Sequence, residues 1–458
     1  MGASTKIARS NRKRAAISAL FCLALFSSTS YAKITITPST QQISEYEASN
    51  ETTRVNLLIQ LAQSGQHELA SVLLTLYPLS GNFATNRTLF IEGLILHGRG
   101  DLTGAVQKYR DALADNPGLT LVRSELAKTL VELGENDSAK HHLQLLMADA
   151  PSAVEAQGIR SFIDTIDARR PFTFNTYVSI APSTNVNNGS SIKKVYLSDT
   201  ESITPGEQEK SGIGFSTGAS AGYAKRLGND FSLVLSGGLN AQIYSDKVFN
   251  TFGASESAEL RYLLKDGHIG AGMIGSQSIK SDASGLGYYS YGPRVGLQKD
   301  LTPKDRVNLS SVYEWRNYPD NALSDGTALM IDGSWSHAFS SDLNVSVNGG
   351  YDRVKSGLDY NSYNSYSAGL GVYKEMPMGI TANIHGQVSQ SDFDTIFPIY
   401  NVVRKDMRYT GTVGLTKRDF NIWGYAPALE YTYLFNDSNV ANYHFDSHAV
   451  NFKLSKDF

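Results

Sequence analysis

The sequence predicts an α + β membrane protein, in which an N-terminal α-helical repeat solenoid precedes an antiparallel transmembrane β-barrel of about 14 strands. Three observations predict it: helix-spaced apolar residues with an internal repeat, a later region of two-residue alternation, and an export signal. Only 19% of the 458 residues are charged, and mean hydropathy is −0.24. This hydropathy excludes a polytopic helical membrane protein, but it suits a barrel, whose alternating strands average out to mild polarity.

Residues 1–32 are predicted to form a cleaved signal peptide. An apolar run at 15–26 is too short to cross a membrane as a helix, which takes about 20 residues. Ser30 and Ala32 place small residues before Lys33, as at a signal-peptidase site. We therefore expect residues 33–50 to be an N-terminal extension of the mature chain. The apolar run follows a basic segment without acidic residues, formed by Lys6, Arg9, Arg12, Lys13 and Arg14.

Cleavage would leave a mature chain that is acidic and free of cysteine. The single cysteine, Cys22, lies in the apolar run, so we expect no thiol, disulfide or cysteine-ligated metal. The chain has 41 basic and 44 acidic residues, and five basic ones would leave with the signal peptide, giving a net charge of −8. This balance argues against nucleic acid as a partner.

Residues 51–170 contain an internal period of 34 residues, the length of a tetratricopeptide repeat, which consists of two antiparallel helices. A weaker unit around Gly65 is out of frame by one residue, so we predict two good repeats and one degenerate one. Gly93 and Ala127 fall where paired helices should cross closely. Because the segment follows an export signal, we expect it in the periplasm. Four matched pairs define the period: Gly100 and Gly134, Asp101 and Glu135, Ala105 and Ala139, and Pro117 and Pro151.

Stacked repeats leave a concave surface that is lined by the first helix of each unit. We predict that this surface is a groove for a partner peptide or domain. The alternative is a solenoid that only packs against the rest of the chain. The residues predicted to face the groove are Arg87, Phe90 and His97 in one unit, and Leu121, Ser124, Lys128 and Val131 in the next.

Residues 171–458 are predicted to form an outer-membrane β-barrel. Fourteen segments alternate apolar and small or polar residues with a period of two, and an even number suits a closed bacterial barrel. Short turns such as 227–230 and 340–342 alternate with long polar loops, which we predict at 185–211 and 389–405. The alternative to a membrane barrel is a large soluble β-sandwich, which would need no aromatic girdle. Tyrosine and tryptophan nevertheless gather near the predicted strand ends, at Tyr223, Tyr244, Trp315, Tyr351 and Tyr433.

Motifs that resemble catalytic sites lie in strand contexts. The G-x-S-x-G match at 214–218 places Ser216 inside a predicted strand, whereas a nucleophile elbow needs a strand, a turn and a helix. The glycines of 270–275 precede no helix, so they do not form a phosphate cradle. We predict no catalytic residue, no cofactor and no metal site. Four carboxylates at inward positions are expected to line the lumen: Glu314, Asp332, Asp352 and Glu430.

The domain order and the junction segment 177–188 (YVSIAPSTNVNN) resemble the surface lipoprotein assembly modulator (Slam) family. The terminal Phe458 agrees with this resemblance, because it resembles the recognition signal of the barrel-assembly machinery. The resemblance implies a translocator that carries a client across the outer membrane. It implies clients that are surface lipoproteins or secreted haem- or metal-capturing proteins with a small C-terminal β-barrel domain. The implied partners are the barrel-assembly machinery, periplasmic chaperones and outer-membrane lipid.

Two other functions suit a barrel. In polysaccharide export porins a periplasmic tetratricopeptide domain also precedes a barrel, but those proteins usually carry many more repeats than the two or three predicted here. A passive nutrient channel would leave the helical domain without a role.

Overall fold

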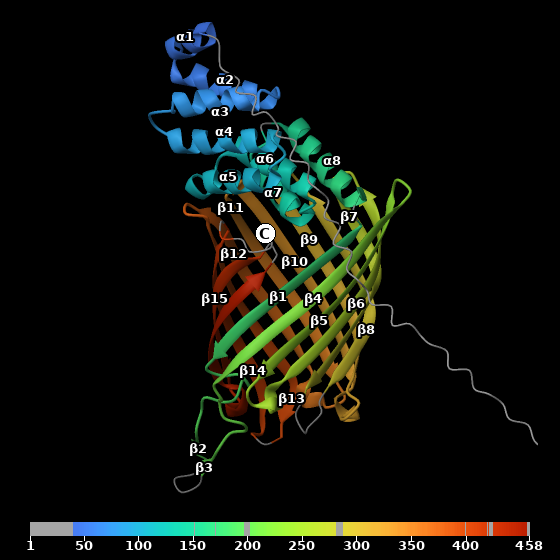
Figure 1. Cartoon of the computed structure of the whole chain (residues 1–458). Helices are drawn as coiled ribbons and strands as arrows, with labels where there is room; N and C mark the ends of the chain where they lie inside the picture. The colour runs from blue at the N-terminus through green and yellow to red at the C-terminus, as the bar shows by residue number, and fades with distance from the viewer. Residues whose placement is uncertain are drawn as a thin grey trace, which may run out of the picture.

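The computed structural model describes residues 40–150, 152–169, 171–196, 202–280, 287–398, 400–418, 420 and 425–455. The predicted signal peptide (1–32) and Phe458 lie outside these residues. The helices stack at one end of a barrel, and the small hairpin of β2 (Val195–Tyr196) and β3 (Ser202–Ile203) extends from the other end (Figure 1). Within the described ranges, no helix has both the length and the apolar character needed to span a membrane.

Within the described residues, eight helices precede the barrel, and most of them form antiparallel pairs. The pairs α2–α3, α4–α5 and α6–α7 correspond to the degenerate repeat and the two good repeats, so the predicted solenoid is confirmed. The helices are α1 (Thr40–Ala48), α2 (Glu51–Gln63), α3 (His67–Leu76), α4 (Ala84–Gly98), α5 (Leu102–Asp115), α6 (Thr120–Leu133), α7 (Asn136–Ala148) and α8 (Ala153–Arg169).

The repeat period has a structural cause in the turn between the helices of each pair. Gly65, Gly100 and Gly134 each lie in this turn with φ of 85°, 83° and 80°. Side chains with a Cβ rarely adopt this left-handed conformation, so glycine recurs at the same place in each unit. In the middle unit, the Asp101 carboxylate accepts a hydrogen bond of 2.9 Å from the Gly104 N–H and caps α5.

Gly93 is needed because α4 and α5 cross closely. A Cβ at this position would lie 2.4 Å from the ring of Tyr109, which is fully buried. We expect Gly93→Ala to lower the free energy of unfolding of the solenoid by about 1–3 kcal/mol, because the fixed ring must move. The measurement is urea unfolding followed by the helical far-UV signal. Gly158→Ala in α8 is the control: it fills open space and should be neutral or stabilising by up to about 1 kcal/mol.

The barrel closes with fourteen antiparallel strands in the order β1, β4, β5 and so on to β16, which pairs with β1. The predicted strand number is therefore confirmed. The strands are β1 (Phe172–Ser183), β4 (Gly212–Leu227), β5 (Phe231–Tyr244), β6 (Thr251–Leu264), β7 (Gly267–Lys280), β8 (Tyr288–Asp300), β9 (Asp305–Asn317), β10 (Gly326–Ser340), β11 (Leu343–Ser356), β12 (Tyr363–Met376), β13 (Ile380–Phe397), β14 (Val402–Lys417), β15 (Ala426–Ser438) and β16 (Phe445–Ser455).

Alternate residues of each strand put large apolar side chains on the outer wall. Ile180 pairs with Phe215 on one side and with Phe452 on the other, and all three are exposed there. Aromatic pairs stand near both ends of the strands: Phe172–Tyr223 at the end near the helices, with centroids 4.8 Å apart, and Tyr291–Trp315 towards the other end, 5.5 Å apart. This is the pattern of a lipid-facing barrel.

One predicted loop is wrong. The segment 389–405 was expected to be a long polar loop, but β13 continues to Phe397 and β14 already begins at Val402. The register shifts between Asp392 and Ile396, so an irregular pairing accommodates the polar residues. Phe393 and Phe397 are buried there, which explains why the strands extend. The other predicted loop, 185–211, contains the hairpin of β2 (Val195–Tyr196) and β3 (Ser202–Ile203).

Candidate functional site

The solenoid carries a groove of about 430 Å³ across the first helices of its three repeats, α2, α4 and α6. Its apolar lining includes Phe83 and Leu121, whose exposed fractions are 62% and 54%. A groove that gathers several apolar side chains at the surface marks an interaction site more often than a single exposed apolar side chain does. The groove is therefore suited to an apolar segment of another chain.

The structure brings three of the seven predicted groove residues together. Arg87, Phe90 and Leu121 line the groove. Arg87 is held by Glu51 of α2 at 3.3 Å, and Phe90 is largely buried with its ring 6.1 Å from that of Tyr109.

The other four predicted residues lie outside the lining of this groove. His97 contacts Glu132 at 3.1 Å, and Lys128 contacts Glu125 at 2.8 Å. Val131 packs against the core, and Ser124 is half-buried on α6. A role of these side chains in partner binding stays a prediction.

Sequence reasoning missed the contribution of the first repeat. Val55 and Ile59 of α2 line the groove, together with Phe83 and Asn86 at the start of α4. The one-residue offset of the degenerate repeat hid the correspondence of α2 with α4. The spacing of Val55 and Ile59, which places them on one helix face, was an available signal.

A buried ion cluster fixes the solenoid to the barrel. Glu375 at the end of β12 accepts a hydrogen bond from Arg123 of α6 at 2.6 Å and forms an ion pair with Arg418, just after β14, at 2.7 Å. Arg123 and Glu375 have an exposed fraction of 0%. The Tyr373 hydroxyl donates to the other carboxylate oxygen of Glu375 at 2.9 Å, and it lies 3.2 Å from His141 Nε2 of α7.

Further contacts run around the same rim. Arg160 of α8 pairs with Asp266 in the β6–β7 turn and with Asp300 at the end of β8, both at 2.8 Å. The Asp149 carboxylate accepts from the Ser341 N–H in the β10–β11 turn at 3.1 Å. With the Glu375 cluster, these contacts reach hairpins from β6 to β14. The last helices of the solenoid therefore span the end of the barrel (Figure 1).

His142 makes the docked solenoid sensitive to acid. Burial, and then the charge of Arg123, hold the pKa of His142 well below its ordinary value of 6.5. The neutral ring can accept a hydrogen bond from Arg123 Nη1, which lies 3.3 Å from its Nδ1. In the unfolded chain His142 is exposed and binds a proton below about pH 6.5, whereas in the folded protein its ring stays neutral. The contribution of His142 to the free energy of unfolding is therefore present above that pH and is lost as the pH falls.

We expect the free energy of unfolding of the solenoid to drop by about 1 kcal/mol between pH 6.5 and 5.5 through His142 alone. His142→Gln should remove this part of the pH dependence, since glutamine keeps an acceptor and does not titrate. Urea unfolding of both proteins at the two pH values measures the difference. His97→Gln, which changes an exposed histidine, is the control and should retain the drop.

The residues that resemble catalytic motifs lie in strands, as predicted. Ser216 is in the middle of β4, paired with Ser179 and Gln242, and Gly270 and Gly275 are in β7. Within the described part of the chain, no group of three or more His, Cys, Asp or Glu side chains could hold a metal ion. Of the lumen carboxylates, Glu314 is buried and pairs with Arg316 at 3.1 Å.

The fold and the docked solenoid define an outer-membrane β-barrel with a periplasmic tetratricopeptide domain, the architecture of an outer-membrane translocator. The short hairpin turns under the solenoid mark the periplasmic end of the barrel. The chain belongs to the Surface lipoprotein assembly modifier family, whose model matches residues 172–458. A tetratricopeptide-repeat model matches residues 96–161. This family and the fold indicate a transport or assembly protein rather than an enzyme.

Relatives match most of the chain. A Surface lipoprotein assembly modifier of Pasteurella multocida is 23% identical over 80% of this chain and 75% of its own length. A Hemophilin secretion modulator of Acinetobacter baumannii is 23% identical over 85% and 82%. Among solved structures, the toluene transporter TodX of P. putida aligns with a TM-score of 0.37 at 11% identity, over 64% of this chain and 92% of that one.

Proposed function

We propose that this protein delivers a specific client protein from the periplasm across the outer membrane. The names of its relatives support two client classes, a surface lipoprotein and a secreted hemophilin-like protein, either of which would carry a small C-terminal β-barrel domain. The observation that carries the proposal is the buried Arg123–Glu375–Arg418 cluster. It holds a solenoid with an open apolar groove against the periplasmic end of the barrel, where a client would arrive.

In this proposal the groove of α2, α4 and α6 receives an apolar segment of the client, or of a chaperone that accompanies it. Phe83 and Leu121 offer the exposed apolar contact, and Arg87 offers a charge at the edge. The barrel-assembly machinery is a further proposed partner, acting with the barrel in the membrane. The periplasm holds no nucleotide supply, so the driving force would come from client folding outside the cell or from energy spent elsewhere.

The test is co-expression with a client encoded by a neighbouring gene that has a C-terminal small-barrel domain. Surface-exposed or secreted client is measured by protease accessibility of whole cells and by its amount in the medium. We expect display to depend on this protein. Equal display in its absence contradicts the proposal. A client variant without the small-barrel domain is the matched control, and it should stay in the periplasm.

A further inference from the structure

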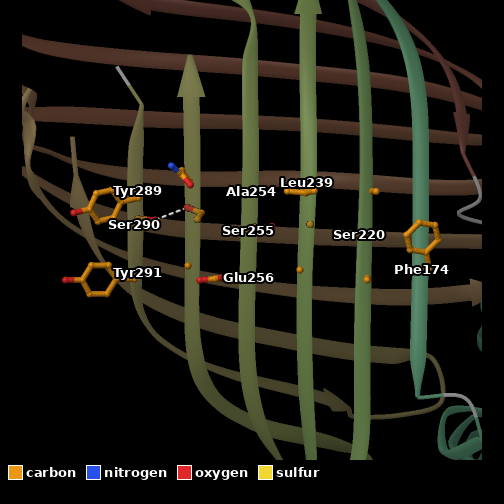
Figure 2. Close-up of a pocket in the computed structure, with 16 residues that line it drawn as sticks. Phe174, Ser220, Leu239, Ala254, Ser255, Glu256, Tyr289, Ser290 and Tyr291 are labelled. Carbon is orange, nitrogen blue, oxygen red and sulfur yellow. Dashed lines mark hydrogen bonds between the residues drawn. The ribbon is translucent and has the colours of Figure 1, made fainter. Parts of the chain in front are cut away.

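The outer wall of strands β4 to β8 contains a trough of about 700 Å³ (Figure 2). Apart from a single glutamate, no residue of the row that joins Phe174 to Tyr291 carries more than a methyl group between these two aromatic rings. In Figure 2, Phe174 stands on one side of the trough and Tyr289 and Tyr291 on the other. This row, followed from strand to strand by the register, consists of Phe174, Ala221, Gly237, Glu256, Gly275 and Tyr291.

Glu256 faces the membrane. It shares its face of β6 with Phe252 and Tyr262, whose exposed fractions are 43% and 46%. These two aromatic residues lie near opposite ends of β6 (Thr251–Leu264), and Glu256 lies between them. The carboxylate is therefore inside the apolar band of the barrel rather than at the level of the lipid headgroups.

Glu256 is also without a partner. Among the described residues, none forms a hydrogen bond or an ion pair with it. Its side chain lies over the bare backbone of Gly275, where a Cβ would come within 2.9 Å of a carboxylate oxygen. A carboxylate on the opposite face of the same strand is paired: Glu259 binds Arg261 at 2.7 Å. An unpaired carboxylate facing lipid is unfavourable, and ionisable residues kept at such depth usually serve a function.

We propose that this trough binds a second membrane protein, through a protruding lipid-facing segment that carries an arginine, lysine or amide side chain opposite Glu256. A lipid acyl chain has no donor for the carboxylate. A second copy of this chain would place its own concave trough against this one and bring the two Glu256 carboxylates together. The small floor residues allow a partner backbone to approach closely, as small residues do between membrane helices. Gln277, also in the lining, offers a second polar group.

The test uses a photo-crosslinking amino acid placed at Leu239, which lines the trough, in living cells. The control position is Leu370 on β12, an exposed lipid-facing residue of the opposite wall. We expect a protein adduct from the first position and none from the second. The adduct should map next to an arginine, lysine, asparagine or glutamine of the partner. Its yield should fall about tenfold or more in Glu256→Leu, which removes a hydrogen bond to a charged group.

Assembly of each variant is checked by heat-modifiable gel mobility, and Glu256→Gln is a second variant of matched size that should give an intermediate yield. Adducts to lipid only, adducts to a second copy of this chain, or an unchanged yield in both assembled variants would each overturn the proposal. Neither readout uses a client, so a failure here leaves the proposed delivery function untouched, and the reverse also holds.

Discussion

Replacement of Glu375 by alanine is expected to release the solenoid from the barrel while both parts stay folded. The change leaves Arg123, which is fully buried, and Arg418, which is largely buried, without their shared carboxylate. Removing one member of a buried ion pair costs about 3–5 kcal/mol. Undocking would relieve most of this cost, because the two guanidinium groups would regain water. In Glu375→Ala the undocked state of the solenoid should therefore become more stable than the docked state.

The release can be measured as a distance distribution between spin labels on cysteines introduced at Lys128 and Lys265. The predicted mature chain has no other cysteine, so the labels are specific. We expect a narrow distribution in the parent protein and a broad one in Glu375→Ala. Glu68→Ala is the control, because it breaks only the exposed pair with Arg99, worth about 0–1 kcal/mol. A narrow distribution in Glu375→Ala would mean that the cluster does not hold the solenoid.

The double variant Phe83→Glu and Leu121→Glu is expected to reduce client delivery by about 10- to 100-fold. Burial of one large apolar side chain contributes about 1.5–3 kcal/mol, and a carboxylate in its place opposes an apolar client segment. Both side chains are exposed in the groove, so folding should be unaffected. Secreted or surface-exposed client is the measurement.

The matched control for the groove is Leu76→Glu. Leu76 has a similar exposed fraction of 57% but belongs to α3, outside the groove lining. Delivery by this variant should equal that of the parent protein. Undiminished delivery by the double variant would show that the groove is not a client site, without affecting the conclusion that the solenoid is docked.

Features that depend on near neighbours in the chain were predictable. The glycine turns at Gly100 and Gly134 recur because each helix pair needs a left-handed residue at the same place. Fourteen strands were predicted because alternation shows directly which side chains face lipid. The prediction of a long loop failed at 389–405. Phe393 and Phe397 of this segment are packed by residues from other parts of the barrel, so the polar composition of the segment alone was misleading.

The candidate site was only partly predictable. Arg87, Phe90 and Leu121 were placed in the groove by helical phase alone, whereas Val55 and Ile59 were missed because the first repeat is out of frame. Glu375 carried no local signal. Arg123 carried a weak one, since it is a charge on the buried face of α6 between Val122 and Leu126.

The sequence by itself determined the two parts, their periods and the family, because a helix repeats every 3.6 residues and a strand every two. Only the tertiary structure decided how the parts are joined. Arg123 and Glu375 are 252 residues apart in the chain, and they meet only after the repeats have stacked and the barrel has closed. The closed barrel also forms the trough. In the sequence Glu256 is one polar residue in a predicted strand, and only strand pairing places it between Gly237 and Gly275.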